Sequence, residues 1–259
     1  MILDEIAERT VKRIREEEKL FPLSEMRRVA ESLPVSDDFS FYRALKGDGI
    51  SFICEVKRAS PSKGVIAEHF PYTEIAREYE EAGADAISCL TEPYYFKGSD
   101  KYLEDITKTV RIPVLRKDFV IDEYMIYQAK AIGASAILLI CSLLDRQRLT
   151  EYRTIARALG LSALVEAHDE REIEDALYAG AKIIGVNNRN LKTFEVDVDN
   201  SVRLRKLVPP ETVFVSESGI KTPKDIERLI RNGADAVLIG ETLMRSGDKK
   251  RMLKELKGR

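Results

Sequence analysis

Glu55 and Lys57 are two residues of opposite charge at the end of an apolar segment, Ile50 to Val56, that is typical of a buried strand. Because side chains alternate across a strand, the two share one face with Ile53. A carboxylate or an ammonium group that points into a sheet loses its hydration, which is unfavourable unless the group is paired or used. Both residues are therefore candidates for acid–base chemistry, with a structural ion pair as the alternative.

Four similar six-residue motifs, copies of one short word, recur along the chain and predict the scaffold that positions this pair. Their glycines follow one another at near-regular intervals of about 50 residues, which is typical of repeated supersecondary units. Each glycine ends a helix-like stretch and precedes an apolar, strand-like one, as at a helix C-terminus that leads into a buried parallel strand. The four copies are AGADAI (Ala82 to Ile87), IGASAI (Ile132 to Ile137), AGAKII (Ala179 to Ile184) and NGADAV (Asn232 to Val237).

With Ile50 to Val56 as the first strand, three further apolar segments between these words complete a count of eight strands. They are Ile112 to Arg116, Ser162 to Val165 and Thr212 to Val215. Eight strands alternating with amphipathic helices predict a closed (β/α)8 TIM barrel, an α/β fold whose usual size is about 250 residues. An open doubly wound sheet is the alternative, although nothing in that fold requires eight strands.

The N-terminal segment lies outside this count. We expect one domain of 259 residues, in which residues 1–48 form a helical extension packed on the barrel and residues 49–259 form the barrel itself. An apolar stripe from Ile2 to Ile14 predicts a first helix, and Phe39 to Lys46 a second, short one. A segment of this length cannot bury enough apolar surface to form a core of its own. We therefore expect it to lie across one end of the barrel.

Charge and composition exclude several classes of protein. The 42 basic and 44 acidic residues are mixed along the chain and give a net charge of −2, so we expect no nucleic-acid partner. The longest uncharged apolar run, Ala131 to Leu144, is shorter than the ~18 residues of a membrane helix, so no membrane partner is expected. The acidic residues Asp4 and Glu5 argue against a signal peptide and favour a cytoplasmic protein, which we expect to be a monomer.

The three cysteines carry no sign of a disulfide or a metal site. They are odd in number, widely spaced and set in apolar strands, which is typical of reduced core packing. Neither His69 nor His168 has the spacing of a metal ligand set, so we expect no metal and assign neither histidine a role. Acid catalysis would then fall to lysine or glutamic acid side chains whose pKa values are shifted by their surroundings.

Polar residues follow most of the predicted strands at the point where each strand ends. In a barrel the C-terminal ends of the strands form the active site, so these residues are expected to meet there. Three carboxylates and two lysines would then converge on one small volume, whereas each of them alone could be a solvated charge. The residues that follow the strands are Glu55 and Lys57, then Lys117, Glu166, Asn187 with Arg189, Glu217 to Gly219, and Gly240 with Glu241.

Small residues after the last two strands predict a phosphate site. Barrels often hold a phosphate with the loops after strands seven and eight, where glycine lets backbone N–H groups approach an anion. Here Ser218 and Gly219 follow the seventh strand, and Gly240 and Glu241 follow the eighth. Two ordinary tight turns are the alternative interpretation.

Longer motifs make the chain similar to the indole-3-glycerol phosphate synthase family, barrel enzymes of tryptophan biosynthesis. The resemblance runs nearly end to end, and EVKRASPSKG and GVNNRNL are its most specific words. The motifs include EVKRASPSKG (Glu55 to Gly64), LTEPYYFKGS (Leu90 to Ser99), VLRKDFVID (Val114 to Asp122), LVEAH (Leu164 to His168), GVNNRNL (Gly185 to Leu191), VSESGI (Val215 to Ile220) and LIGETLM (Leu238 to Met244).

The resemblance implies a carboxy-lyase that acts on one small phosphorylated substrate and needs no cofactor. That substrate, 1-(2-carboxyphenylamino)-1-deoxyribulose 5-phosphate, would be closed to indole-3-glycerol phosphate with loss of carbon dioxide and water. Lys117 matches the acid of ring closure, Lys57 matches the group that holds the substrate carboxylate, and it is also a candidate acid for the later step. Glu166 and Glu55 match the acid and base of dehydration.

The remaining matched positions bind and orient the substrate. Those that orient its sugar, its carboxylate and the catalytic groups are Ser60, Asn187, Arg189 and Glu217; the phosphate cradle is Ser218, Gly219, Gly240 and Glu241; the apolar wall for the aromatic ring is Phe96, Phe119, Leu138 and Leu191. Two departures stand out. The chain has no tryptophan, whereas some relatives place a tryptophan of the first helix over the ring. Glu241 occupies a position at which a serine also occurs in the family.

Two other functions fit the same residues. A sugar-phosphate isomerase or a Schiff-base aldolase would use Lys57 or Lys117 as a covalent amine. A non-catalytic barrel that only binds phosphate would keep the cradle and have no use for the acids, and the full set of Glu55, Lys57, Lys117 and Glu166 argues against it.

Overall fold

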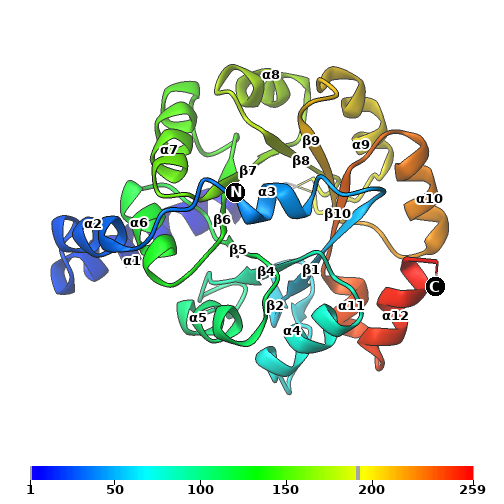
Figure 1. Ribbon diagram of the computed structural model, residues 1–259, viewed down its shortest axis with the longest axis horizontal. Helices are drawn as coiled ribbons and strands as arrows, with labels where there is room; N and C mark the ends of the chain where they lie inside the picture. Colours follow the sequence, from blue (N-terminus) through cyan, green and yellow to red (C-terminus); the bar gives the residue numbers. More distant parts are fainter. Residues whose placement is uncertain (1, 191–192, 259) are drawn as a thin grey trace.

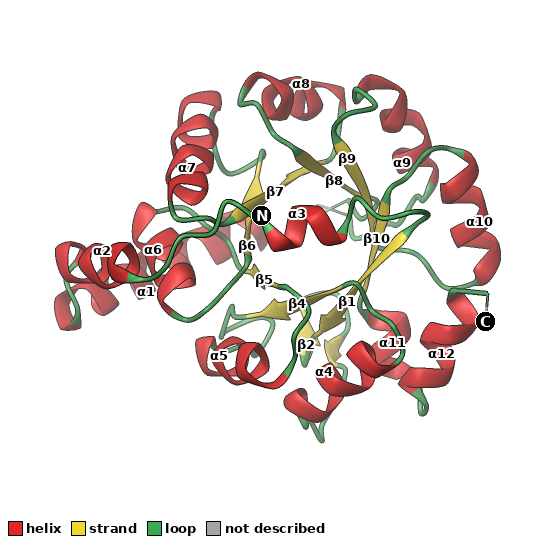
Figure 2. Cartoon of the chain, viewed as in Figure 1, coloured by secondary structure: helices red, strands yellow, loops and turns green. Residues whose placement is uncertain are grey.

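The strands of the computed structural model, which describes residues 2–190 and 193–258, close into one parallel barrel. Their order around the ring is β1-β10-β9-β8-β7-β6-β5-β4, and the pairing of β1 with both β10 and β4 closes it (Figure 2). The predicted barrel is confirmed and the open sheet is excluded. The strands are β1 (Ser51–Val56), β4 (Ala86–Leu90), β5 (Val114–Lys117), β6 (Ala136–Ile140), β7 (Ser162–Ala167), β8 (Ile183–Asn187), β9 (Val213–Glu217) and β10 (Ala236–Ile239).

Helices surround the ring on the outside, as Figure 1 shows. Each connects the C-terminal end of one strand to the N-terminal end of the next. They are α4 (Tyr72–Glu81), α5 (Asp100–Thr109), α6 (Glu123–Ala131), α7 (Arg146–Ala158), α8 (Glu170–Tyr178), α9 (Asp199–Leu204) with the 3-10 turn η1 (Arg205–Leu207), and α10 (Pro223–Arg231), while α11 (Glu241–Arg245) and α12 (Lys249–Leu256) follow the last strand.

The glycines of the repeated word end four of these helices. Gly83, Gly133, Gly180 and Gly233 have φ values between +76° and +89°, the left-handed conformation that commonly follows a helix C-cap. Only glycine adopts it without a steric penalty, so the chain can leave the helix and turn directly into the next strand. The recurrence of the word therefore has a backbone cause.

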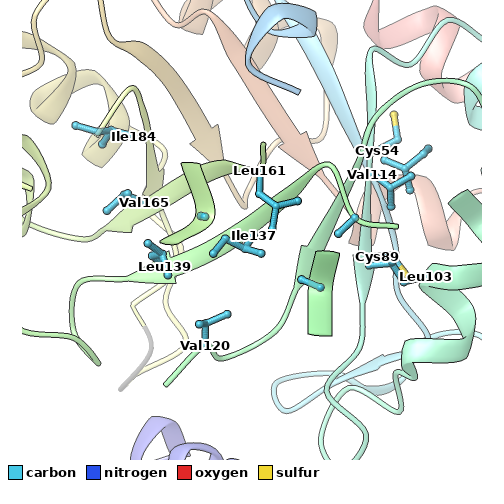
Figure 3. Close-up of a cluster of buried hydrophobic side chains, with 14 of the residues drawn as sticks. Cys54, Cys89, Leu103, Val114, Val120, Ile137, Leu139, Leu161, Val165 and Ile184 are labelled. Carbon is cyan, nitrogen blue, oxygen red and sulfur yellow. The ribbon is translucent and has the colours of Figure 1, made fainter. Parts of the chain in front are cut away.

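Alternation along the strands separates two apolar cores. Outward-facing side chains such as Cys54, Cys89 and Val165 pack in the shell between strands and helices (Figure 3). Inward-facing ones such as Ile53 and Leu164 fill the barrel. All three cysteines are free and buried, so they act as small apolar residues.

The N-terminal segment contacts both ends of the barrel rather than one. Helix α3 (Ser40–Ala44) lies across the opening that faces the viewer in Figure 1, where Phe41 and Leu45 join the inner core. Helix α1 (Ile2–Leu20) reaches the opposite end with its first two turns. Between them α2 (Leu23–Ser32) packs on α6; we had not expected this helix, whose N-terminus no side chain caps.

Two strands outside the barrel form a small hairpin in the loop after β1. They are β2 (Ala59–Ser60) and β3 (Gly64–Val65), which pair antiparallel.

Within the described residues, no helix is both long and apolar enough to cross a membrane.

Phe41 and Leu45 act as a plug that closes the end of the barrel covered by α3. Removing this plug should destabilise the fold and leave the chemistry in place. Phe41 is fully buried, so Phe41→Ala is expected to lower the free energy of unfolding by about 3–5 kcal/mol. The polar residues lie at the C-terminal ends of the strands, at the other end of the barrel. The KM of Phe41→Ala should therefore stay within about twofold of wild type. Phe21→Ala, at a partly exposed position of the same segment, is the control for urea unfolding. Equal losses for both variants would contradict a plug.

Candidate active site

A cavity of about 630 Å3 opens at the C-terminal ends of the strands. Every predicted site residue that the structure describes lines it, and Leu191 lies outside the described residues. The cavity brings together Glu55, Lys57, Ser60, Phe96, Lys117, Phe119, Leu138, Glu166, Asn187, Arg189, Glu217, Ser218, Gly219, Gly240 and Glu241. Residues more than 180 positions apart in the chain thus share one volume, because each lies in a barrel strand or in the loop that follows one.

Lys117 lies at the centre of the polar part of this cavity. Its Nζ contacts Glu166 Oε2 at 3.0 Å and Glu217 Oε2 at 2.9 Å. The three side chains end the alternate strands β5, β7 and β9, which in a barrel contribute to one layer of inward-facing residues. All three are nearly withdrawn from solvent, with 12%, 3% and 2% of the side chain exposed.

The pKa values of Lys117, Glu166 and Glu217 are shifted in different directions, so the three groups differ in which of them holds a proton. Burial alone would lower the pKa of Lys117, but Glu166 and Glu217 outweigh it and raise that pKa, so the amine stays an ammonium. Burial alone would raise the pKa of Glu166, yet Lys117 and His168 lower it, so this carboxylate is ionised. Burial and the nearby charge of Glu166 raise the pKa of Glu217 to about 7. Glu217 is therefore the carboxyl of the pair that holds a proton near neutrality.

Glu217 depends on a glycine that we had not singled out from the sequence. A Cβ at Gly185 would lie 2.1 Å from Glu217 Oε1, so any other residue there would displace the carboxylate. Gly185 ends no helix, and its φ is not positive, so no turn pattern marks it. In the register of β8 and β9, Gly185 pairs with Val215, two residues before Glu217 and on the same face of the strand, so its closeness to the Glu217 carboxylate follows only from this pairing.

Glu55 and Lys57 form an ion pair at the end of β1. Gly240 lies directly against this pair. A Cβ at that position would lie 2.2 Å from Glu55 Oε1 and 2.9 Å from Lys57 Nζ. Gly240 was predicted to let an anion approach the backbone, and the structure adds that it makes room for the Glu55 carboxylate.

At the rim, the carboxylate of Glu241 lies among three cations. Arg245 Nε is 3.1 Å away, Lys63 Nζ 3.6 Å and Arg189 Nη2 3.7 Å. Partial burial would raise the pKa of Glu241, but Arg245, Lys63 and Arg189 outweigh it and lower that pKa. The Glu241 side chain thus offsets the charge of a basic patch at the rim of the cavity that the Ser218-Gly219 turn also lines.

Opposite the polar cluster the cavity has an apolar wall. The rings of Phe96 and Phe119 lie with centroids 5.9 Å apart, and Leu138 is almost fully buried. Ile2, Leu3 and Ile6 of α1 line the same cavity. Aliphatic side chains of the first helix thus border the cavity at this end of the barrel.

Two buried carboxylates hold this wall in place. Glu92 accepts hydrogen bonds from the backbone N–H groups of Tyr94, Tyr95 and Phe96, at 2.7 to 2.9 Å, and so shapes the loop that carries Phe96. Asp118 accepts one from Arg13 of α1 at 3.0 Å, and the charge of Arg13 helps keep its pKa low despite burial. The first helix is therefore tied to the residue between Lys117 and Phe119.

The described residues hold no cluster of three His, Cys, Asp or Glu side chains that could bind a metal ion. What the cavity offers is an ammonium between two carboxylates, a second lysine with its own carboxylate, a basic rim and an apolar wall. Such a set can transfer protons to an anionic, aromatic substrate.

Comparison with known proteins agrees with this geometry. The family model of indole-3-glycerol phosphate synthase matches residues 3–256. Curated relatives of that name include the Ruminiclostridium cellulolyticum protein, 59% identical over 100% of this chain and 99% of the relative, and the Endomicrobium trichonymphae protein, 55% identical over 99% and 100%.

Solved structures at low identity share the fold alone. A 3-hexulose-6-phosphate synthase has a TM-score of 0.63 at 15% identity, covering 81% of this chain and 99% of that one. A mutant tryptophan synthase alpha-subunit from Pyrococcus furiosus has a TM-score of 0.62 at 16% identity, covering 81% and 98%. With a family match over almost its whole length and full-length relatives above 50% identity, the chain belongs to the indole-3-glycerol phosphate synthase family.

Proposed function

We propose that the polar side chains of this cavity divide between them the reaction of the family, the conversion of 1-(2-carboxyphenylamino)-1-deoxyribulose 5-phosphate to indole-3-glycerol phosphate. Ring closure and dehydration each require a proton to be given or taken. The observation that carries the assignment is Lys117, an ammonium fixed between Glu166 and Glu217 at the centre of the cavity.

Lys117 is the acid of ring closure. When the aromatic carbon attacks the ribulose carbonyl, negative charge develops on the carbonyl oxygen, and a neighbouring ammonium both stabilises and protonates it. An alkoxide is a stronger base than an amine, so an ammonium of raised pKa is still a sufficient donor. Glu217, which shares this ammonium with Glu166, positions it.

Lys57 holds the substrate carboxylate until it leaves as carbon dioxide. Its ammonium is partly buried beside Glu55, where charge attraction is stronger than in water. In the dehydration that follows, Glu166 donates a proton to the departing hydroxyl and Glu55 removes a proton from the ring. Ser60, Asn187 and Arg189 orient the sugar and the carboxylate.

The substrate's two ends are held at opposite sides of this cluster. Phe96, Phe119 and Leu138 pack against the aromatic ring. The backbone of Ser218-Gly219 and Gly240-Glu241 binds the phosphate at the basic rim. We assign the ring-binding role to Leu191 from its motif alone.

The covalent alternative is less well supported. A Schiff base requires a neutral amine as nucleophile, whereas the two carboxylates keep Lys117 protonated. A barrel that only binds phosphate would have no use for these buried acids, whose desolvation is unfavourable.

We also propose that the protein works as a monomer in the cytoplasm. All three cysteines are free and buried, which suits a reducing compartment. Sedimentation of the purified protein at micromolar concentration measures the oligomeric state.

The activity itself is measured by following indole fluorescence after the purified protein is mixed with the substrate. The chain has no tryptophan, so the protein contributes little background. No fluorescence increase with intact substrate would overturn the proposed function.

Replacing the central ammonium should abolish chemistry more than binding. Lys117→Ala is expected to lower kcat by about 10²-fold or more and to change KM less than tenfold, since general acid catalysis contributes ~10²–10⁴. Lys108→Ala, on the exposed face of α5, is the matched control. A Lys117→Ala enzyme that keeps half of its turnover would refute the assignment.

The raised pKa of Glu217 should appear in the pH dependence of stability. Its value is about 7 in the folded protein against an ordinary 4.5, so between these pH values the fold holds a proton that the unfolded chain has lost. The free energy of unfolding therefore falls as pH rises through this window. Glu217→Gln should reduce the loss of Tm between pH 5 and pH 8, whereas Glu211→Gln, exposed just before β9, should not. An unchanged pH dependence in Glu217→Gln would show that Glu217 ionises normally.

The basic rim should bind phosphate better without its own carboxylate. Glu241→Ser keeps the backbone donors and frees Lys63, Arg189 and Arg245, so KM should be unchanged or lower. Steady-state kinetics with Glu227→Ser on α10 as control decides this. A tenfold rise in KM for Glu241→Ser alone would place the phosphate elsewhere.

A further inference from the structure

His168 lies directly behind Glu166, outside the cavity. Its Nε2 faces Glu166 Oε1 at 3.5 Å, while Glu166 itself lines the cavity and His168 does not. On its other side, Nδ1 is 3.0 Å from Glu172 Oε2 in the first turn of α8. The imidazole therefore bridges a catalytic carboxylate and a second one nearer the surface.

The Nε2 atom is buried, and no described residue forms a hydrogen bond with it. A buried polar nitrogen without a partner is unfavourable, and its position toward Glu166 suits a proton that moves rather than a fixed bond. Glu172 also accepts a hydrogen bond from the backbone N–H of His168 at 2.8 Å, so the ring is held at both its backbone and its Nδ1.

The reaction creates a need for such a group. The substrate carboxylate leaves as carbon dioxide, the ketone oxygen takes up two protons to leave as water, and one proton is lost from the ring. One proton per turnover must therefore enter from solvent. Yet Glu166 is ionised at rest, and a substrate bound in the cavity that Glu166 lines would stand between this carboxylate and solvent.

We propose that Glu172, His168 and Glu166 form a relay that delivers this proton, with His168 as its donor. The inference rests on the acid role proposed above for Glu166. The imidazolium first transfers its Nε2 proton to Glu166 Oε1 and remains neutral, with its Nδ1 proton on the Glu172 side. Glu166 then gives that proton to the hydroxyl, which leaves as water with the bonding electron pair, and the imidazole is reprotonated from solvent.

The charges around His168 favour its protonated form. Burial alone would lower its pKa, but the hydrogen bond to Glu172 and the charge of Glu166 outweigh this and raise it, with a smaller contribution from Glu217. Lys117, on the far side of Glu166, is the cation that faces this group. On α9, Asn200 meets only the backbone carbonyl of His168, and its side chain is neutral. The imidazolium thus persists above pH 6.5 and is lost as pH rises through the raised pKa.

The test compares kcat as a function of pH in four variants of the full-length enzyme. His168→Gln cannot carry a proton, so kcat at pH 8 should fall about tenfold with KM within twofold, and the alkaline limb assigned to His168 should disappear. Glu172→Gln should move that limb to lower pH, while Glu174→Gln, exposed on the same helix, should not. In His168→Ala, added imidazole should restore kcat in proportion to its concentration, which a purely structural role would not allow.

Each outcome decides the matter. A His168→Gln profile that superimposes on wild type, or a loss in His168→Ala that imidazole leaves unchanged, would overturn the relay. Glu166→Gln separates it from the role of Glu166. If Glu166→Gln is inactive and His168→Gln is normal, only the relay fails; if Glu166→Gln is fully active, the acid role fails first and the relay with it.

Discussion

The burial of one ammonium between two carboxylates is the constraint on which the rest of this molecule depends. Lys117, Glu166 and Glu217 each lose hydration at the end of a strand, and their mutual contacts offset much of that loss. Because the three come from alternate strands of a closed ring, a change in register of any one of them would separate the charges. The same contacts that make the cluster tolerable keep Lys117 protonated, Glu166 ionised and Glu217 able to hold a proton.

Room for these charges comes from glycine. Gly185 lies against Glu217 and Gly240 against Glu55, so two strands give up a side chain where a carboxylate must fit. At the rim Glu241 offsets the charge of three cations, while the apolar wall is completed by the first turns of α1. The cavity is thus divided into a polar centre, a basic rim and an apolar side, which matches a substrate with a carboxylate, a phosphate and an aromatic ring.

The N-terminal segment links the two ends of the barrel. At one end, α3 and the residue after it fill the barrel opening with Phe41 and Leu45. At the other end, where the strands end in the cavity, α1 is held by the ion pair of Arg13 with Asp118. Asp118 lies between Lys117 and Phe119 in the chain, so the position of α1 and that of two cavity side chains are mechanically connected. His168 extends the polar centre in the other direction, toward the surface at α8.

The sequence by itself determined the eightfold alternation, the face that each strand presents and the residues that follow each strand, because these depend on local periodicity and on glycines with positive φ. It therefore identified Lys117, Glu166 and Glu217 as neighbours without coordinates. It missed α2, whose N-terminus has no side-chain cap, and it assigned His168 no role. Only the tertiary structure decided which atoms touch: that Gly185 makes space for Glu217, that Glu241 lies among cations, and that His168 lies behind Glu166. These relations join residues on different strands and helices, and the distance between such residues is set by barrel closure and helix packing, which no local pattern encodes.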